Sequence, residues 1–182
     1  MTTNDIRGLR TSFTREEYVS DEHFTREMES VYGSTWCFAG LSQELSHVGD
    51  RLVAEVGNES ILIVRNREEE LRAYYNVCQH RGSQLCDESG SGHGAAITCP
   101  YHAWSYSLDG KLVSAIHHAK EDFDRECIAL TSVRVEEWQG CIFVCLSETA
   151  PSLIDSLEHL YSAPRSLERF DLGSLVRAHH TV

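Results

Sequence analysis

Apolar residues with helical spacing mark a segment near the start of the chain. One face of the expected helix carries Phe24, Met28, Val31 and Tyr32, at positions i, i+4, i+7 and i+8. Ser20 is expected to cap this helix, which begins at Asp21 and ends at Gly33. Residues 1–20 are polar and are interpreted as an arm.

From Trp36 onward the pattern changes to short β-rich runs separated by Gly, Asn and Asp. Two of these runs flank Gly57-Asn58-Glu59, which predicts a hairpin. The expected strands are 36–40, 51–56, 60–65, 71–76, 95–99, 104–107, 111–114, 133–138 and 141–146. Many short strands at close spacing predict a mainly β protein with antiparallel sheets packed on each other.

Helical spacing returns after Pro151, which suits the first turn of a helix. The apolar positions of this segment are Leu153, Ile154, Leu157, Leu160 and Tyr161. The sequence therefore divides into three parts. These are an arm and helix over 1–34, a β domain over 35–150, and a helical linker over 151–182.

Charge and composition exclude several classes of protein. The 182 residues carry a formal net charge of -12, which argues against binding to nucleic acid or to an anionic membrane. No apolar run reaches the roughly 18 residues that span a bilayer, and we find no secretory signal. Seven Cys is an odd number, which favours reduced thiols and a cytoplasmic location.

Two short motifs carry the candidate chemistry. Cys78-x-His80 and Cys99-x-x-His102 each supply one thiol and one imidazole. Such a set can hold Zn²⁺, or a [2Fe–2S] cluster in which two His replace two Cys on one iron. Structural zinc sites usually pair Cys with Cys in one loop. The mixed loops therefore favour two metals, with both Cys on one iron and both His on the other.

These motifs resemble the Rieske domain of Rieske non-haem iron oxygenases, specifically their α subunit. The resemblance rests on Cys78-Gln79-His80-Arg81-Gly82 and Cys99-Pro100-Tyr101-His102-Ala103-Trp104, and it extends over roughly residues 20–180. It implies a Rieske-type antiparallel β-sandwich with two cluster-binding loops, flanked by an N-terminal helix and a C-terminal helical segment. The implied ligands of the [2Fe–2S] cluster are Cys78, His80, Cys99 and His102.

Neighbouring residues indicate a low reduction potential. Rieske proteins of cytochrome complexes carry a disulfide between the loops, but Ser83 and Tyr101 occupy the matching positions here. Trp104 stands where the high-potential type places a hydroxyl, and Tyr106 could supply another hydrogen bond. Fewer hydrogen bonds to the cluster lower its potential, so we expect about -150 mV or slightly below.

The remaining thiols and two His pairs have simpler interpretations. Buried small side chains are expected at Cys37, Cys86, Cys127, Cys141 and Cys145, with Cys86 as the candidate exception because it lies in a cluster loop. Cys141 and Cys145 are expected to point inward on one strand face. The pairs His117-His118 and His179-His180 are not expected to bind one metal, because adjacent strand residues face opposite ways. The Gly- and Ser-rich residues 87–94 are expected to form a harmless loop.

The resemblance also implies an activity that this sequence does not complete. Such oxygenases use a mononuclear Fe(II) held by two His and one carboxylate, but the family's spacing does not occur here. We expect that site in an absent catalytic domain after Val182, so this chain alone transfers electrons. The implied partners are an NAD(P)H-dependent reductase or ferredoxin and further copies in a trimer-type homo-oligomer.

The substrate class and two competing interpretations stay open. The implied reaction is O₂-dependent hydroxylation or demethylation of an aromatic or quaternary ammonium substrate. The sequence lies nearest to the branch that oxidises glycine betaine, choline or carnitine. A stand-alone Rieske ferredoxin and a zinc-binding interaction module are the alternatives. Metal content distinguishes the zinc module from the oxygenase interpretation, and a catalytic domain encoded downstream would distinguish the ferredoxin from it.

Overall fold

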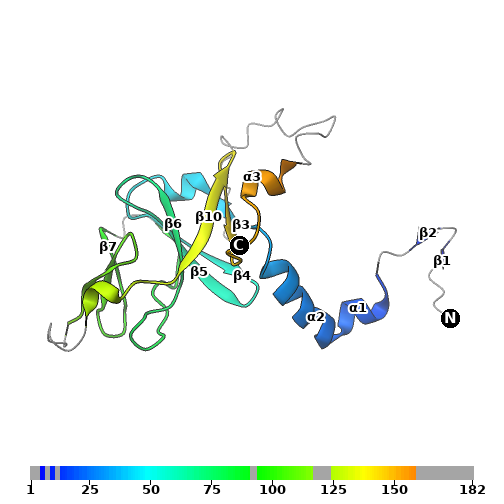
Figure 1. Cartoon of the computed structure of the whole chain (residues 1–182), viewed down its shortest axis with the longest axis horizontal. Coiled ribbons are helices and arrows are strands. Elements are labelled where there is room, and N and C mark those ends of the chain that lie inside the picture. The colour runs from blue at the N-terminus through cyan, green and yellow to red at the C-terminus, as the bar shows by residue number, and fades with distance from the viewer. Residues whose placement is uncertain (1–4, 7–8, 11–12, 91–93, 117–123, 159–182) are drawn as a thin grey trace, which may run out of the picture.

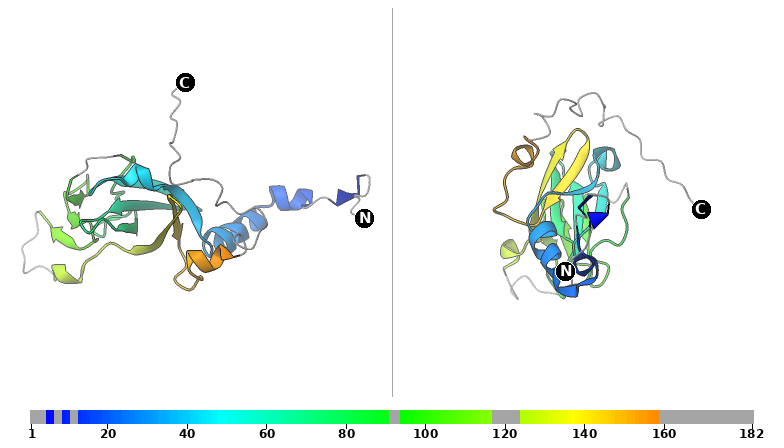
Figure 2. Two further views of the ribbon diagram at one scale, coloured as in Figure 1. Left: turned by 90° about the horizontal axis from the view of Figure 1, so that it is seen from above. Right: turned by 90° about the vertical axis from the view of Figure 1, so that its right-hand side faces the viewer.

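The computed structural model describes residues 5–6, 9–10, 13–90, 94–116 and 124–158 (Figure 1). An arm precedes the β domain. It contains the two-residue strands β1 and β2 and the helices α1 and α2, and it ends in a π-helix. Their bounds are Asp5–Ile6, Leu9–Arg10, Arg15–Val19, Asp21–Glu27 and Met28–Tyr32. Figure 2 shows α1 and α2 projecting away from the strands.

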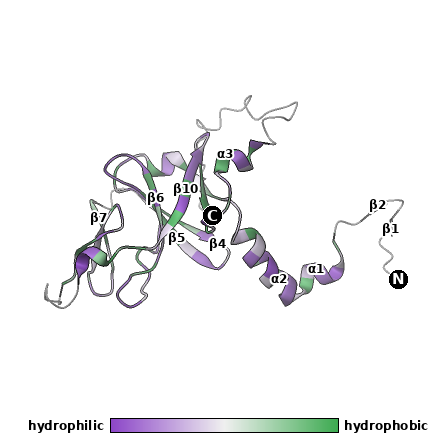
Figure 3. Cartoon of the chain, in the orientation of Figure 1, coloured by the Kyte–Doolittle hydropathy of each residue, from purple (hydrophilic) through white to green (hydrophobic). Residues whose placement is uncertain are grey.

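The helical segment from α2 to the π-helix begins and ends where the sequence predicted a helix, but it differs inside. Ser20 caps α2 by accepting from the His23 amide, and the segment ends at Gly33. The helix α1 was not predicted, and the last turn is a π-helix. No residue of α1, α2 or the π-helix is buried, and hydrophilic and hydrophobic residues mix along α1 and α2 (Figure 3).

Six strands form the larger sheet, in the order β3-β11-β10-β6-β5-β4, and all neighbours are antiparallel. The strands span Cys37–Leu41 (β3), Arg51–Val56 (β4), Glu59–Arg65 (β5), Leu71–Tyr75 (β6), Ser132–Trp138 (β10) and Cys141–Cys145 (β11). The two edge strands of this sheet approach each other, since a Cβ added to Gly40 of β3 would lie only 2.5 Å from Leu52 Cδ2 of β4. The sheet therefore bends back on itself.

A smaller sheet has the order β7-β8-β9. Its strands span Ala96–Thr98, Ser105–Ser107 and Leu112–Ser114. The described residues also contain two short 3₁₀ segments, Ser42–Leu45 and Arg125–Cys127, and one helical turn, α3 (Leu153–Ser156). The nine predicted strands are confirmed to within one residue at each end, and the mainly β, antiparallel fold is confirmed.

Two hydrophobic cores lie on opposite faces of β5. Ile61 and Ile63 pack with Leu52, Val133 and other residues inside the curved large sheet. Leu62 and Val64 face the small sheet instead. Because both faces of β5 are buried, its sequence is continuously apolar rather than alternating. The second core joins the two sheets and contains the two motif cysteines.

The structure corrects several expectations about the remaining residues. Among the five other cysteines, Cys145 alone is buried; Cys127 is exposed and Cys37, Cys86 and Cys141 are half-buried. On β11 Ile142, Val144 and Cys145 are buried whereas Cys141 is half-buried, so Cys145 but not Cys141 lies in the core. Of the predicted C-terminal helical segment the structure describes one turn, Leu153–Ser156, and its predicted positions at 160 and 161 lie outside the described residues.

Candidate functional site

Two loops carry the four predicted metal ligands. The first loop follows β6 and begins at Cys78. β6 is an inner strand of the large sheet and is buried on the side that faces the small sheet. The second loop joins β7 to β8 and begins at Cys99, directly after Thr98. Cys78 and Cys99 are 2% and 3% exposed, and both belong to the core between the two sheets.

The two loops have the same backbone hydrogen-bond pattern. The Cys78 amide donates to the Ser83 carbonyl at 2.8 Å, and the Cys99 amide donates to the Trp104 carbonyl at 2.8 Å. Each cysteine carbonyl in turn accepts from the amide four residues ahead, that of Gly82 at 3.0 Å and that of Ala103 at 3.1 Å. The loops are therefore matched turns that present their cysteines and histidines to one another.

The residue four positions after the cysteine in each turn has a positive φ. The value is 70° at Gly82 and 56° at Ala103. Glycine adopts this left-handed conformation without steric cost, whereas alanine does so with strain. The second loop therefore has the same left-handed backbone conformation as the first, although this conformation costs energy at Ala103.

The imidazoles of His80 and His102 lie together, with ring centroids 4.9 Å apart and an interplanar angle of 71°. Aromatic residues from the second loop pack on both rings. Trp104 stacks on His80 at 4.6 Å and 9°, and Tyr101 lies against His102 at 3.7 Å. Both imidazoles are half-buried while the two thiols are buried. The histidines therefore form the outer side of the site and the cysteines the inner side.

Tyr106 supplies the polar contact on the buried side. Its hydroxyl lies 3.3 Å from Cys78 Sγ and accepts from the Gln79 amide at 3.1 Å. The Tyr106 side chain is fully buried, and burial raises the pKa of its phenol above the usual range. The hydroxyl therefore keeps its proton and can donate it toward a thiolate sulfur. Burial also raises the pKa of the Cys78 thiol, with contributions from the nearby Cys99 that act in the same direction.

Two observations bear on whether these residues suit a metal cluster. His102 Nδ1 is buried and has no hydrogen-bond partner, which is the expected state of a nitrogen reserved for a metal. The side chains that the two loops bring together are two buried thiols and two half-buried imidazoles. They match in kind the two-Cys, two-His donor set of a Rieske cluster, in which each iron has two protein ligands.

Asn76 is a site residue that the sequence analysis did not identify. It is 1% exposed, and its side chain fastens the returning end of the first loop. Its Oδ1 accepts from the amides of Leu85 and Cys86, and its Nδ2 donates to the Cys86 carbonyl at 2.7 Å. A polar residue at the end of a buried strand, two positions before Cys78, was the available signal.

The end of this loop is also attached to the large sheet. Arg51 of β4 pairs with Gly90 through two backbone hydrogen bonds, and its guanidinium donates to the Ala96 carbonyl at 2.5 Å. Ser89 Oγ accepts from the Val53 amide. Residues 89 and 90 are therefore fixed against the edge strand. The pair His117-His118, His93 and His179-His180 lie outside the described residues.

Comparisons with known proteins agree with this geometry. The family model of the Rieske [2Fe–2S] domain matches residues 35–134. The carnitine monooxygenase oxygenase subunit of Escherichia coli strain K12 is 40% identical over 144 residues, covering 79% of this chain and 38% of the relative. The glycine betaine monooxygenase oxygenase subunit of Pseudomonas aeruginosa is 34% identical over 172 residues, covering 92% and 40%.

A solved structure gives the same result. The quaternary ammonium Rieske monooxygenase CntA, in complex with L-carnitine, superposes with a TM-score of 0.76 at 35% identity. The match covers 85% of this chain and 43% of that one. This chain thus spans about two-fifths of the length of the relatives that it matches. None of the described helices is long and apolar enough to cross a membrane.

Proposed function

Because this chain belongs to the Rieske [2Fe–2S] domain family, we propose that it is the electron-transfer portion of an oxygenase α subunit. The observation that carries this proposal is the pair of matched turns, which bring His80 to His102 and bury Cys78 and Cys99 behind them. In this proposal the two thiolates hold one iron and the two imidazoles hold the other. When bound, the cluster accepts one electron and passes it on.

The burial of the proposed ligands would determine on which side of the site electrons enter and leave. Half-buried imidazoles reach the surface, whereas the thiols face the core between the sheets. Electrons would therefore enter and leave on the side of His80 and His102. Trp104 and Tyr101 hold the two rings, and Tyr106 would donate its hydrogen bond to the Cys78 sulfur. One donor of this kind suits a potential near the low end of the Rieske range, about -150 mV.

The proposed activity rests on the proteins that this chain resembles. The similar proteins are named as monooxygenases of carnitine and of glycine betaine, so we propose a quaternary ammonium substrate. Residues 1–34 would be the N-terminal arm, 35–150 the Rieske domain and 151–182 a linker to a catalytic domain with a mononuclear Fe(II). A reductase or ferredoxin would supply electrons, and copies of the subunit would assemble into a trimer-type oligomer in the cytoplasm.

The proposal is tested by the metal content and spectrum of the purified chain. After anaerobic reconstitution with iron and sulfide, we expect two Fe per chain and no stoichiometric Zn. Dithionite reduction should then produce the rhombic low-temperature EPR signal of mixed His and Cys ligation. One Zn per chain with a silent spectrum would overturn the proposal and favour the zinc-binding module.

Cysteine variants make the test specific to the proposed ligands. Cys78→Ser and Cys99→Ser should abolish the signal, because each removes a thiolate from the same iron. Cys86→Ser is the matched control, since Cys86 lies in the same loop but its thiol donates to the Glu88 carbonyl at 3.0 Å. A signal that survives in Cys78→Ser, or is lost in Cys86→Ser, would show that the ligands are assigned wrongly.

A further inference from the structure

The chain leaves the β domain through a segment without regular structure. Residues 146–152 connect the end of β11 to α3, and the side chain of Arg134 on β10 holds them. Its guanidinium donates to three backbone carbonyls: Ser147 at 3.1 Å, Ala150 at 2.6 Å and Pro151 at 3.1 Å. A planar group with five fixed donors suits such a contact with several carbonyls.

Two further side chains fasten the same segment. Trp36 Nε1 donates to the Pro151 carbonyl at 3.0 Å, and the Trp36 ring lies under the Arg134 guanidinium at 4.8 Å. Glu136 lies 3.8 Å from the Arg134 guanidinium and accepts from the Leu153 amide at 3.1 Å. The Leu153 amide is in the first turn of α3, so the start of that helix is fixed to β10 as well. In Figure 1 α3 lies beside β10.

These contacts are connected to the first motif loop through the sheet. Arg134 follows Val133, which pairs with Ala73 of β6. Ala73 lies five residues before Cys78 on the strand that leads into the loop. β6 leads into the first motif loop, β10 carries Arg134 and Glu136, and the two strands are antiparallel neighbours in one sheet. Motion of β10 relative to β6 would require breaking that pairing.

We propose that Arg134, Trp36 and Glu136 form an exit clamp that fixes the direction in which the chain leaves the Rieske domain. The three are positioning residues, because they act on the exit segment and do not contact the site. Residues 146–152 form no helix or strand, and the clamp side chains bind backbone carbonyls of this segment instead. The clamp holds residues 147–153, up to the first turn of α3, in a fixed position on β10. The clamp itself does not rest on the proposed function.

The test is hydrogen exchange of backbone amides, followed by mass spectrometry on the chain. Arg134→Met removes the guanidinium but keeps an unbranched apolar stem. We expect the peptide covering 147–157 to exchange at least tenfold faster than in the wild-type chain. The peptide covering 78–85 should keep its wild-type exchange, because the clamp does not hold the motif loop.

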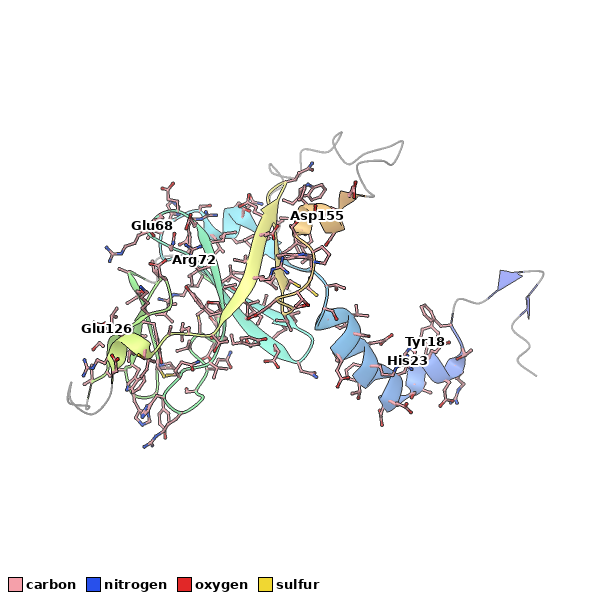
Figure 4. The ribbon with its side chains drawn as sticks, in the orientation of Figure 1. Tyr18, His23, Glu68, Arg72, Glu126 and Asp155 are labelled. Carbon is pink, nitrogen blue, oxygen red and sulfur yellow. The ribbon has the colours of Figure 1, made fainter. Side chains whose placement is uncertain are left out.

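A matched control is Arg72→Met, which removes another arginine of the same sheet. Arg72 pairs with Glu70 and Asp109, and Figure 4 shows it well away from Asp155 of α3. Arg72→Met should leave exchange at 147–157 unchanged. Unchanged exchange in Arg134→Met, or equal acceleration in both variants, would overturn the proposal.

A second variant keeps the test decisive if Arg134→Met does not fold. Trp36→Phe keeps an aromatic ring under the guanidinium but loses the Nε1 donor to Pro151. Faster exchange confined to 147–157 would support the clamp, and unchanged exchange would overturn it. Because the chain is measured without metal, failure to bind a cluster would count against the proposed function and leave this result unaffected.

Discussion

The indole of Trp104 lies parallel to the imidazole of His80, with ring centroids 4.6 Å apart and an interplanar angle of 9°. The two rings come from different loops, so their stacking joins the turn after β6 to the turn after β7. Trp104 is 5% exposed and is packed in the core between the sheets. A core residue therefore sets the ring plane of His80, because stacking and packing restrict its rotamers.

We predict that Trp104→Leu weakens retention of iron. Without the indole, the His80 ring can rotate away from a metal. Residues that support ligands typically contribute about 10- to 100-fold in metal affinity. The measurement is the rate at which a ferrous chelator bleaches the visible absorbance of the reconstituted chain. Trp104→Phe, which keeps a smaller aromatic face, should lie between the wild type and Trp104→Leu.

Trp138→Leu provides the control for this prediction. Trp138 is at the far end of β10, in the hairpin with β11, and removing it changes the size of a half-buried aromatic residue without touching His80. Bleaching at the wild-type rate is expected there. Equal bleaching rates in Trp104→Leu and the wild type would count against the supporting role of the stack.

Tyr106→Phe is predicted to lower the reduction potential of the cluster. The hydroxyl lies 3.3 Å from Cys78 Sγ, and its bond strengthens when the cluster gains negative charge. A net hydrogen-bond contribution of about 1 kcal/mol corresponds to about 40 mV for one electron. A redox titration followed by EPR measures this shift.

The control for the Tyr106 prediction is another buried tyrosine. Tyr74→Phe also removes one buried hydroxyl, but that hydroxyl donates to the Leu108 carbonyl at 3.0 Å and not to a motif cysteine. Its potential should stay at the wild-type value. A drop of similar size in both variants would mean that general loosening of the core, and not the sulfur contact, sets the potential.

Local pattern was sufficient to predict most of the fold. Short β-rich runs punctuated by Gly, Asn or Asp placed all nine predicted strands to within one residue, whereas β1 and β2 in the arm were not predicted. The mixed composition of the two motifs, one Cys and one His in each, was sufficient to predict that His80 and His102 lie together, and their ring centroids are 4.9 Å apart although the loops follow strands of different sheets. On β11, however, Cys141 and Ile142 are both apolar, so alternation alone could not decide which of them faces the core.

The local pattern of apolar and polar residues could not predict contacts between segments that are far apart in the sequence. The Trp36 indole donates to Pro151, 115 residues away, and nothing near either residue indicates the other. The left-handed conformation of Ala103 was equally hidden, because the local sequence gives no sign that an alanine adopts a positive φ. The first contact depends on the folded sheet, which brings distant segments together, and the Ala103 conformation goes with the backbone hydrogen bonds of the turn that begins at Cys99.

The matched turns predict opposite effects of two substitutions. Ala103→Gly should stabilise the fold by about 1 kcal/mol, because it relieves a left-handed alanine. Gly82→Ala should destabilise it by about the same amount. An added Cβ at Gly82 would meet nothing within 4 Å, so only the backbone conformation contributes. Urea unfolding of both metal-free variants measures the free energies. Two shifts of the same sign would contradict the equivalence of the turns.

Alkaline pH should destabilise the fold through Tyr74. Burial, with a contribution from the Asp109 carboxylate, raises the pKa of Tyr74 from about 10 to about 12. Below pH 10 the Tyr74 phenol is protonated in the folded and the unfolded chain, so the free energy of unfolding does not depend on pH through this group. As pH rises from 10 through 12 the free energy of unfolding falls, because the unfolded chain releases the Tyr74 proton first. Two pKa units correspond to about 2–3 kcal/mol at the end of that window.

Comparison of Tyr74→Phe with the wild type isolates this effect. At pH 9 the variant should be less stable by about 1 kcal/mol, because it lacks the hydrogen bond to Leu108. Between pH 10 and 12 the free energy of unfolding of the wild type falls, whereas that of Tyr74→Phe does not fall through this group because phenylalanine has no proton to release. The variant should therefore become the more stable of the two. Tyr18→Phe, which alters a side chain 75% exposed on the arm (Figure 4), should follow the wild type throughout. Urea unfolding at several pH values measures the crossing, and parallel curves for Tyr74→Phe and the wild type would show that Tyr74 ionises freely in the folded state.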